Sequence, residues 1–243
     1  MTTPLPGVAA DQPTVVAAAA LPGAAAGLQI AVTAAALPVV ETFHSLQGEG
    51  VHSGRSAFFI RLAGCTVGCP WCDTKHSWPA TAHPRHSLEA LAADAQQAAA
   101  AGAGFVVITG GEPLHHDLDA LTTALRQRTA LPLHLETSGV DRLSGRFDWI
   151  TLSPKRHRPP VDDLLRHCHE LKVVVHESAD LDFAEAMARA ASRIRAGSDS
   201  EAPMLLLQPG WQSTDGQSLA LNYVQSHPAW RLSLQLHKTL GVR

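Results

Sequence analysis

Short apolar runs alternate with longer amphipathic stretches over most of this chain. The apolar runs predict strands at 57–62, 105–109, 131–136, 149–152, 171–175, 204–207 and 232–236. The longer stretches predict helices at 87–101, 118–128, 181–195 and 218–226. Ser87, followed by a run rich in alanine, leucine and glutamine, is a suitable helix start. Runs that are apolar at every position, such as 106–108 and 173–175, favour a parallel sheet buried on both faces.

This alternation of strand and helix predicts an α/β fold. About six strand–helix units are too few for a closed eight-fold barrel, so we expect an incomplete (β/α)6-type barrel, a partial TIM barrel. In barrels the chemistry gathers at the carboxyl ends of the strands. Polar or glycine-rich segments follow the predicted strands at 61–72, 109–113, 136–139, 153–155 and 208–209. We therefore expect the functional site at that end of the barrel.

The first 38 residues follow a different pattern. Alanine runs are interrupted by proline at positions 4, 6, 13, 22 and 38, and no Lys or Arg precedes Arg55. We expect 1–38 to be a low-complexity, Ala/Pro-rich, disordered extension and 39–243 to be the catalytic domain. The charged start of a signal peptide is missing, and no uninterrupted apolar stretch is long enough to cross a bilayer.

Composition narrows the classes of function. A chain of 243 residues can bury one sizeable core. Its formal net charge is −3 with mixed signs, which argues against a nucleic-acid or membrane partner. Three of its four cysteines are close together, which is not typical of a disulfide framework and favours a cytoplasmic location. We expect the remaining one, Cys168, to be a buried thiol.

Three cysteines lie in one loop after the predicted strand 57–62, in the segment Cys65-Thr66-Val67-Gly68-Cys69-Pro70-Trp71-Cys72. Four thiolates would complete a zinc site or fully ligate an iron–sulfur cluster, whereas three leave one iron of a [4Fe–4S] cube open. His76 is near enough in sequence to serve as a fourth zinc ligand. Spacing alone therefore leaves a cluster, a zinc site and buried structural cysteines as alternatives.

Other strand ends also carry suitable chemistry. In Thr109-Gly110-Gly111-Glu112-Pro113 the glycines let a ligand approach the backbone, and the carboxylate can accept hydrogen bonds from an ammonium group. Ser138 and the segment Ser153-Pro154-Lys155 follow later strands. Ahead of the barrel, Gln47 and Glu49 offer groups that can read the amide and guanidine edge of a pterin or purine. Each of these segments, taken alone, is also compatible with an ordinary turn.

The cysteine spacing, with an aromatic residue before the last cysteine, together with the Gly-Gly-Glu turn resembles the radical S-adenosylmethionine (SAM) superfamily. More narrowly, segments 45–50, 59–65 and 69–75 resemble the 7-carboxy-7-deazaguanine synthase family. The resemblance extends from about residue 40 to the end of the chain. Its discriminating parts are Gln-Gly-Glu-Gly at 47–50 and Cys-Asp-Thr-Lys at 72–75, because the cysteine spacing is common to the superfamily.

This resemblance implies a reaction and its cofactors. The substrate is 6-carboxy-5,6,7,8-tetrahydropterin, which becomes 7-carboxy-7-deazaguanine with loss of ammonia on the route to queuosine. A reduced [4Fe–4S] cluster cleaves SAM to a radical that takes a hydrogen atom from the substrate, and SAM is regenerated. The family also uses Mg²⁺, an electron donor such as flavodoxin or ferredoxin, and a homodimeric assembly. The alternatives are an activase of a glycyl radical enzyme and a non-enzymatic zinc-binding module.

The resemblance also implies residue roles. Cys65, Cys69 and Cys72 hold the cluster and, with Arg61, are the expected catalytic residues. SAM is bound by Trp71, Asp73, Gly111, Glu112, Ser138, Ser153, Pro154 and Lys155. The substrate is bound by Leu46, Gln47, Gly48, Glu49, Arg61 and Thr109, with Arg61 holding its carboxylate. Thr74 is the expected Mg²⁺ ligand, although chemistry alone favours the carboxylate of Asp73. Residues 235–238 either reach the pocket or cap the sheet, and the role of Arg243 is open.

Overall fold

A curved sheet is the centre of the computed structural model, which describes residues 35–197 and 201–243. Within those residues it has nine strands in the order β3-β1-β2-β4-β5-β6-β7-β8-β9. The strands are β1 (Ala36–Leu46), β2 (Ser56–Leu62), β3 (Arg85–Ser87), β4 (Val106–Gly110), β5 (Leu133–Thr137), β6 (Trp149–Leu152), β7 (Glu170–Val175), β8 (Met204–Pro209) and β9 (Trp230–Leu232).

Neighbouring strands are parallel from β2 to β9, whereas β1 pairs antiparallel with β2 and β3. The parallel part, with helices between its strands, is the incomplete barrel that the sequence predicts. The helices are α1 (Leu88–Ala100), α2 (Asp119–Arg128), α3 (Asp162–His167), α4 (Ser178–Arg195), α5 (Thr214–Ser226) and α6 (Leu236–Leu240), with 3-10 turns η1 (Lys75–Ser77), η2 (Ala80–Ala82) and η3 (Pro113–His115). None of the helices in the described residues has the length and apolar character needed to cross a membrane.

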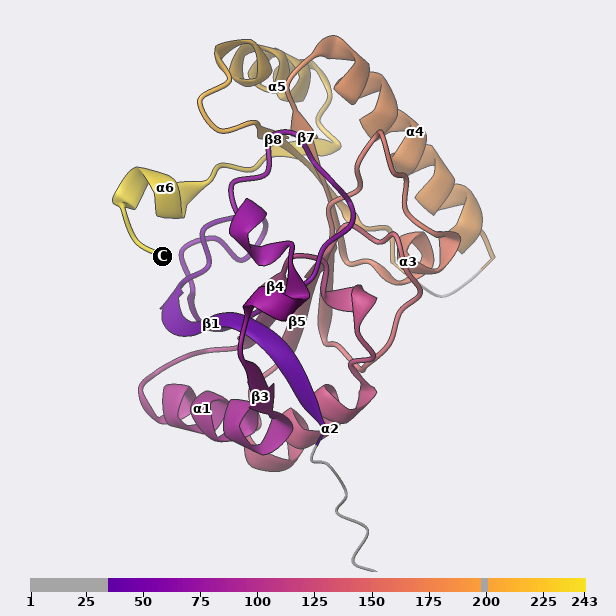
Figure 1. The fold of residues 1–243 in the computed structure, drawn as a ribbon. Helices are drawn as coiled ribbons and strands as arrows, with labels where there is room; N and C mark the ends of the chain where they lie inside the picture. Colours follow the sequence, from indigo (N-terminus) through magenta and orange to yellow (C-terminus); the bar gives the residue numbers. More distant parts are fainter. Residues whose placement is uncertain (1–34, 198–200) are drawn as a thin grey trace, which may run out of the picture. The chain divides into compact units, whose positions relative to one another are not determined.

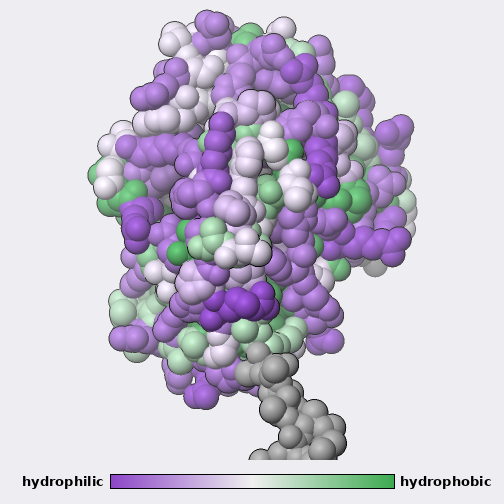
Figure 2. All heavy atoms as spheres, in the orientation of Figure 1, coloured by the Kyte–Doolittle hydropathy of each residue, from purple (hydrophilic) through white to green (hydrophobic). Residues whose placement is uncertain are grey.

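The two faces of the sheet differ in chemistry. On the outer face Ile60 and Ile108 are fully buried and belong to one apolar core with Leu91 of α1 and Leu121 of α2. Figure 1 shows α1 to α5 arranged around the outside of the sheet, while α6 lies on the opposite, open side. On the surface seen in Figure 2, hydrophilic side chains predominate and hydrophobic ones form only small groups. The sheet is thus covered on its outer face, and its inner face is available for a site.

The structure differs from the sequence-based elements near both ends. Strand β1 begins at Ala36, inside the predicted extension 1–38, because its first residues pair with β3; residues 1–34 lie outside the described residues. The alanine-rich composition of that segment concealed the strand. The prediction of a strand at 232–236 is wrong, since β9 ends at Leu232 and α6 begins at Leu236.

Candidate functional site

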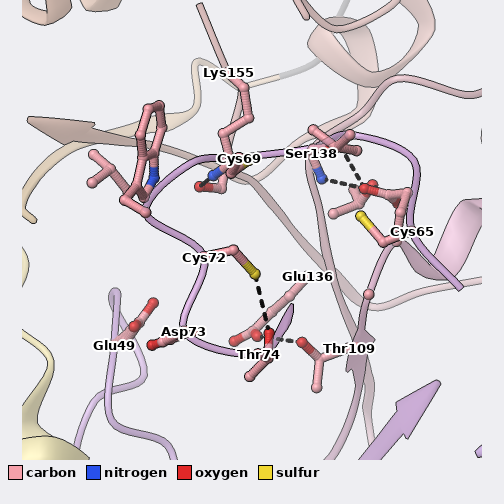
Figure 3. A pocket seen from close by; sticks show the side chains of 18 of the residues that line it. Glu49, Cys65, Cys69, Cys72, Asp73, Thr74, Thr109, Glu136, Ser138 and Lys155 are labelled. Atoms are coloured by element: carbon pink, nitrogen blue, oxygen red, sulfur yellow. Dashed lines mark hydrogen bonds between the residues drawn. The ribbon is translucent and has the colours of Figure 1, made fainter. Parts of the chain in front are cut away.

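The three cysteines of the cysteine loop (residues 65–72) line the same cavity. All three thiols are free and partly exposed, and the cavity, of about 340 Å³, lies at the carboxyl ends of the parallel strands. Figure 3 shows Cys65, Cys69 and Cys72 on different sides of it. Burial raises the pKa of the Cys65 and Cys69 thiols. Metal binding must therefore release protons from them.

The start of the cysteine loop is fixed by its backbone. Gly64 has a φ of +107°, in the left-handed region that glycine adopts without strain. Its N–H donates to the carbonyl of Ser77 at 2.7 Å, and the N–H of Cys65 donates to the carbonyl of Trp78 at 3.1 Å. The chain therefore leaves β2 in a sharp turn that is anchored to η1.

The arrangement of donors fits a cluster better than zinc. Among residues 35–197 and 201–243, no group of three or more His, Cys, Asp or Glu side chains is placed to hold a metal ion. A cube places each cysteine on a different iron, so the sulfurs must stand farther apart than around a single tetrahedral ion. His76 is exposed and does not line the cavity. Three thiols around a shared cavity thus fit a cluster with one open iron.

The Gly-Gly-Glu turn packs directly against the end of β2 and the start of the cysteine loop. A Cβ on Gly110 would collide with the carbonyl of Leu62, and one on Gly111 with the carbonyl of Gly64. Glycine is required here because the end of β4 passes so close to the end of β2 and to the loop that follows it. Both glycines line the cavity.

Glu112 ties β4 to β5. Its carboxylate is 1% exposed and accepts hydrogen bonds from the Thr137 hydroxyl, from the backbone N–H of Ser138 at 2.8 Å, and from the Ser138 hydroxyl. Figure 3 shows Ser138 and its hydrogen bonds close to Cys65. Both residues were predicted to bind SAM, and both line the cavity. In the structure they are hydrogen-bonded to each other.

The segment after β6 brings further predicted residues to this cavity. Ser153 and Lys155 line it, and the Lys155 ammonium donates to the Ser153 hydroxyl at 2.8 Å. Burial lowers the pKa of Lys155. Pro154 is buried and lines neither cavity described here, so the structure does not bring it to the other predicted SAM ligands.

A second cavity, of about 400 Å³, adjoins the first. Predicted substrate residues line it: Leu46, Gln47, Gly48, Glu49, Arg61 and Thr109. Glu49, Arg61 and Thr109 also line the first cavity. The two spaces therefore share a wall of side chains, and the predicted cluster, SAM and substrate residues meet across it.

The β1–β2 loop (residues 47–55) enters this region through buried polar contacts. Glu49 forms an ion pair with Lys172 of β7, whose side chain is 5% exposed, and accepts a hydrogen bond from Gln235 at 2.8 Å. Gln47 donates to Glu136 of β5 at 2.8 Å, and Thr109 donates to the other oxygen of that carboxylate at 2.9 Å. Glu136 is thus the point where the loop and two strands meet.

Glu136 and Lys172 line the site, but the sequence analysis gave neither a role: it placed Glu136 only within the strand-end segment 136–139, and Lys172 only within a predicted strand. Both lie within apolar strand runs, Leu133–Thr137 and Glu170–Val175, at positions that face the inside of the barrel. A charged residue within an otherwise apolar strand, on the face that alternation turns towards the inside of the barrel, is the signal that would have identified them.

Arg61 reaches both cavities from β2. Its Nε donates to Glu41 of β1 at 3.0 Å, and the other oxygen of Glu41 pairs with Arg243 at 3.0 Å. Both guanidinium groups lie over the ring of Phe43, at 5.8 and 5.7 Å. Glu41 fixes the Arg61 side chain through Nε, which leaves the two terminal nitrogens for an anion.

The end of the cysteine loop contacts the C-terminal segment. Asp73 forms an ion pair with Lys238, while Thr74 lines both cavities and its hydroxyl is 3.6 Å from the Cys72 sulfur. Gln235 and Lys238 also line both cavities, so residues 235–238 reach the pocket. Trp71 lines the first cavity, is 43% exposed, and its ring centroid is 5.0 Å from that of His176.

Known proteins resemble this chain in sequence and fold. The family model of the radical SAM superfamily matches residues 59–173. A 7-carboxy-7-deazaguanine synthase from Prochlorococcus marinus is 54% identical, covering 84% of this chain and 97% of its own. One from Escherichia coli is 33% identical, covering 83% and 97%. A crystal structure of QueE from Escherichia coli matches with a TM-score of 0.70 at 32% identity, over 83% of this chain and 95% of that one.

Proposed function

We infer the reaction from the family to which the chain belongs, the 7-carboxy-7-deazaguanine synthases of the radical SAM superfamily. The enzyme converts 6-carboxy-5,6,7,8-tetrahydropterin into 7-carboxy-7-deazaguanine with loss of ammonia, a step towards queuosine. The observation that carries this function is the meeting of the cysteine loop, the glycine turn and the β1–β2 loop around two adjoining cavities. Membership of this family rules out the two alternative functions, an activase of a glycyl radical enzyme and a non-enzymatic zinc-binding module.

The first cavity is the proposed cofactor side. Cys65, Cys69 and Cys72 would hold the [4Fe–4S] cluster, and Gly111 would let SAM approach the backbone. When bound, the cluster and SAM supply a radical that removes a hydrogen atom from the substrate. The protein orients these groups in the first cavity. The hydrogen bonds between Glu112 and Ser138 hold part of the lining of that cavity in place.

The second cavity is the proposed substrate side. Arg61, held by Glu41, is oriented to bind the substrate carboxylate as a fork. Gln47 and Glu136 present an amide and a carboxylate to the cavity, which suits the donors and acceptors on the edge of a pterin. Thr109 and Glu49 border both cavities, so they would contact the substrate where it faces SAM.

We propose Thr74 as the protein ligand of Mg²⁺. Thr74 and Asp73 both line the two cavities, but the Asp73 carboxylate already has a cation partner in Lys238. Substrate oxygens and water would complete the octahedral shell that Mg²⁺ prefers. Thr74→Ala should abolish stimulation of turnover by Mg²⁺, while Thr81→Ala, at an exposed position of η2, should retain it. Full stimulation in Thr74→Ala would contradict the assignment.

We also expect an electron donor such as flavodoxin or ferredoxin and a homodimeric assembly. Apolar side chains near the C-terminus support self-association, since Leu234 is 56% and Leu240 54% exposed. Light scattering during size-exclusion chromatography should give twice the mass of one chain, and a monomer at micromolar concentration would contradict the expectation.

The function is tested by an anaerobic assay of reconstituted protein with 6-carboxytetrahydropterin, SAM, Mg²⁺ and dithionite, analysed by mass spectrometry. We expect 7-carboxy-7-deazaguanine without matching consumption of SAM. Formation of 5′-deoxyadenosine alone would retain the radical chemistry and overturn the substrate. Neither product from a verified cluster would overturn the proposed function.

A further inference from the structure

The turn that follows β6 contacts the exposed side of the cysteine loop. Arg158 donates through Nη1 to the carbonyl of Thr66 at 2.6 Å and to its hydroxyl at 3.0 Å. Nε2 of His157 lies 3.1 Å from the carbonyl oxygen of Val67, within hydrogen-bond distance. Two consecutive side chains of one turn thus hold the two residues that follow Cys65.

A second segment holds Thr66 from its N–H side. Nε2 of His115, in η3, accepts a hydrogen bond from the backbone N–H of Thr66 at 3.1 Å. The imidazole proton therefore lies on Nδ1, which is 2.5 Å from the Asp141 carboxylate and donates to it. Both backbone polar groups of Thr66 have side-chain partners from elsewhere in the fold. The turn between Cys65 and Cys69 is consequently shaped by contacts outside itself.

Arg158 also differs from its neighbour Arg156 in its charge environment. Arg156 pairs with Glu177 and Asp180. Arg158 takes part in no ion pair within residues 35–197 and 201–243, and its partners there are neutral oxygens of Thr66. Its full positive charge therefore remains beside the loop that carries the thiolates.

The same turn also reaches the cavity. The N–H of Arg158 donates to the carbonyl of Lys155 at 3.0 Å, which closes the turn. Lys155 points its ammonium into the first cavity beside Cys69, as Figure 3 shows. A single turn thus links the proposed SAM side of the cavity to the outer side of the cysteine loop.

We propose that Arg158 is a positioning residue for the [4Fe–4S] cluster, an inference that rests on the cluster assignment in the proposed function. Its hydrogen bonds to Thr66 keep the turn between Cys65 and Cys69 in the ligating shape, so the cluster is lost more slowly. Its uncompensated charge favours the reduced, more negative cluster and thus raises the midpoint potential. Supporting residues of this kind typically change metal affinity by about 10–100-fold.

The test compares Arg158→Gln, Arg158→Lys and the matched control Arg156→Gln after anaerobic reconstitution of the full chain. Two readouts are independent of turnover: the rate at which a chelator removes iron, and the midpoint potential from a redox titration followed by electron paramagnetic resonance. We expect Arg158→Gln to lose iron about tenfold faster or more and to have a lower midpoint potential. Arg158→Lys should lose iron faster yet keep the wild-type potential, and Arg156→Gln should match wild type in both.

Each outcome decides a part of the proposal. Wild-type behaviour of Arg158→Gln in both readouts would overturn it entirely. A potential lowered equally in Arg158→Lys and Arg158→Gln would overturn the role of the charge, and slow iron loss in both would overturn the role of the hydrogen bonds. If Arg158→Gln does not fold, as seen by circular dichroism, Arg158→Met replaces it as the variant without the charge, and Arg158→Lys still tests the hydrogen bonds. A wild-type chain that binds no cluster would instead overturn the proposed function.

Discussion

The cysteine loop and the β1–β2 loop border the same two cavities but are held in different ways. The cysteine loop is fixed through its backbone, by Ser77 and Trp78 at its start and by Arg158 and His115 at Thr66. Its cysteine sulfurs have few partners: the Cys72 sulfur lies near the Thr74 hydroxyl, and the Cys65 thiol accepts backbone hydrogen bonds from Val67 and Gly68 of the same loop. The groups that hold this loop are thus different from the groups proposed to bind the cofactor.

In the β1–β2 loop the proposed binding side chains are themselves the anchors. Glu49 is paired with Lys172, and Gln47 is hydrogen-bonded to Glu136. The backbone N–H groups of Gly50 and Val51 donate to Ser233 at 2.9 Å and to Glu170 at 3.0 Å. Substitution of Gln47 or Glu49 is therefore expected to change stability and the proposed substrate binding together, whereas the two effects are separable in the cysteine loop.

The largest effect that tests this difference is the removal of a cysteine ligand. Cys69→Ala should lose the cluster and all turnover while the apoprotein keeps its wild-type melting temperature within a few degrees, because the thiol contributes little to packing. Cys168→Ala, a buried thiol far from the loop, should keep the cluster. Iron and sulfide content with thermal unfolding measures both. A Cys69→Ala protein with full iron content would contradict the ligand assignment.

The next largest effect concerns the buried ion pair. Lys172→Met leaves the Glu49 carboxylate without its cation, and breaking a buried pair in this way costs about 3–5 kcal/mol of unfolding free energy. Lys75→Met, at an exposed position of η1 just after the cysteine loop, should change the unfolding free energy by less than about 0.5 kcal/mol. Urea unfolding of the two variants measures the difference. Equal unfolding free energies would show that Lys172 does not anchor the loop.

The fold and the cofactor side of the site could be predicted because their signals are local. The predicted strand 149–152 coincides with β6, Trp149–Leu152. The cysteines, the glycine turn and Ser138 each follow directly after a strand, and strand ends meet at one end of a barrel. Sequence order was sufficient to bring these residues together around the first cavity.

The substrate side could not be derived in the same way because its contacts join distant parts of the chain. Glu49 and Lys172 are 123 positions apart, and Gln47 and Glu136 are 89 apart. No periodicity specifies such pairs; they follow from the curvature of the sheet, which brings distant strands to one cavity. Lys172 lies within a predicted apolar strand, and residues 235–238 reach the pocket only because the chain returns across the open side after β9.

A smaller effect is expected when one glycine in each loop is replaced by alanine and the unfolding free energies are compared. Gly50 and Gly68 have φ values of +69° and +75°, so alanine at either position costs about 1–2 kcal/mol of backbone strain. At Gly68 the new Cβ has its nearest neighbour at 4.0 Å, but at Gly50 it would collide with the Glu170 carboxylate. We expect Gly50→Ala to lose more unfolding free energy than Gly68→Ala, measured by urea unfolding. An equal loss would show that Glu170 moves aside freely.

The last effect, which builds up only as the pH falls, is the acid dependence of the β1–β2 loop. Burial alone would raise the pKa of Glu49, but the charge of Lys172 and hydrogen bonds from Lys172 and Gln235 outweigh it and lower the pKa from 4.5 to about 2. The unfolded chain therefore binds a proton before the folded one does as the pH falls. The stabilisation is complete above about pH 4.5 and is lost towards pH 2, with a slope of up to about 1.4 kcal/mol per pH unit.

Urea unfolding between pH 5 and about pH 3, with Glu49→Gln as the comparison, measures this contribution. The variant should be less stable at pH 5, because Lys172 has lost its partner, and its stability should fall less steeply with acid. Parallel curves would mean that the Glu49 carboxylate titrates alike in the folded and unfolded chain. In that case Glu49 would not be an anchor, and the β1–β2 loop would be held by Gln47 and by the backbone contacts of Gly50 and Val51.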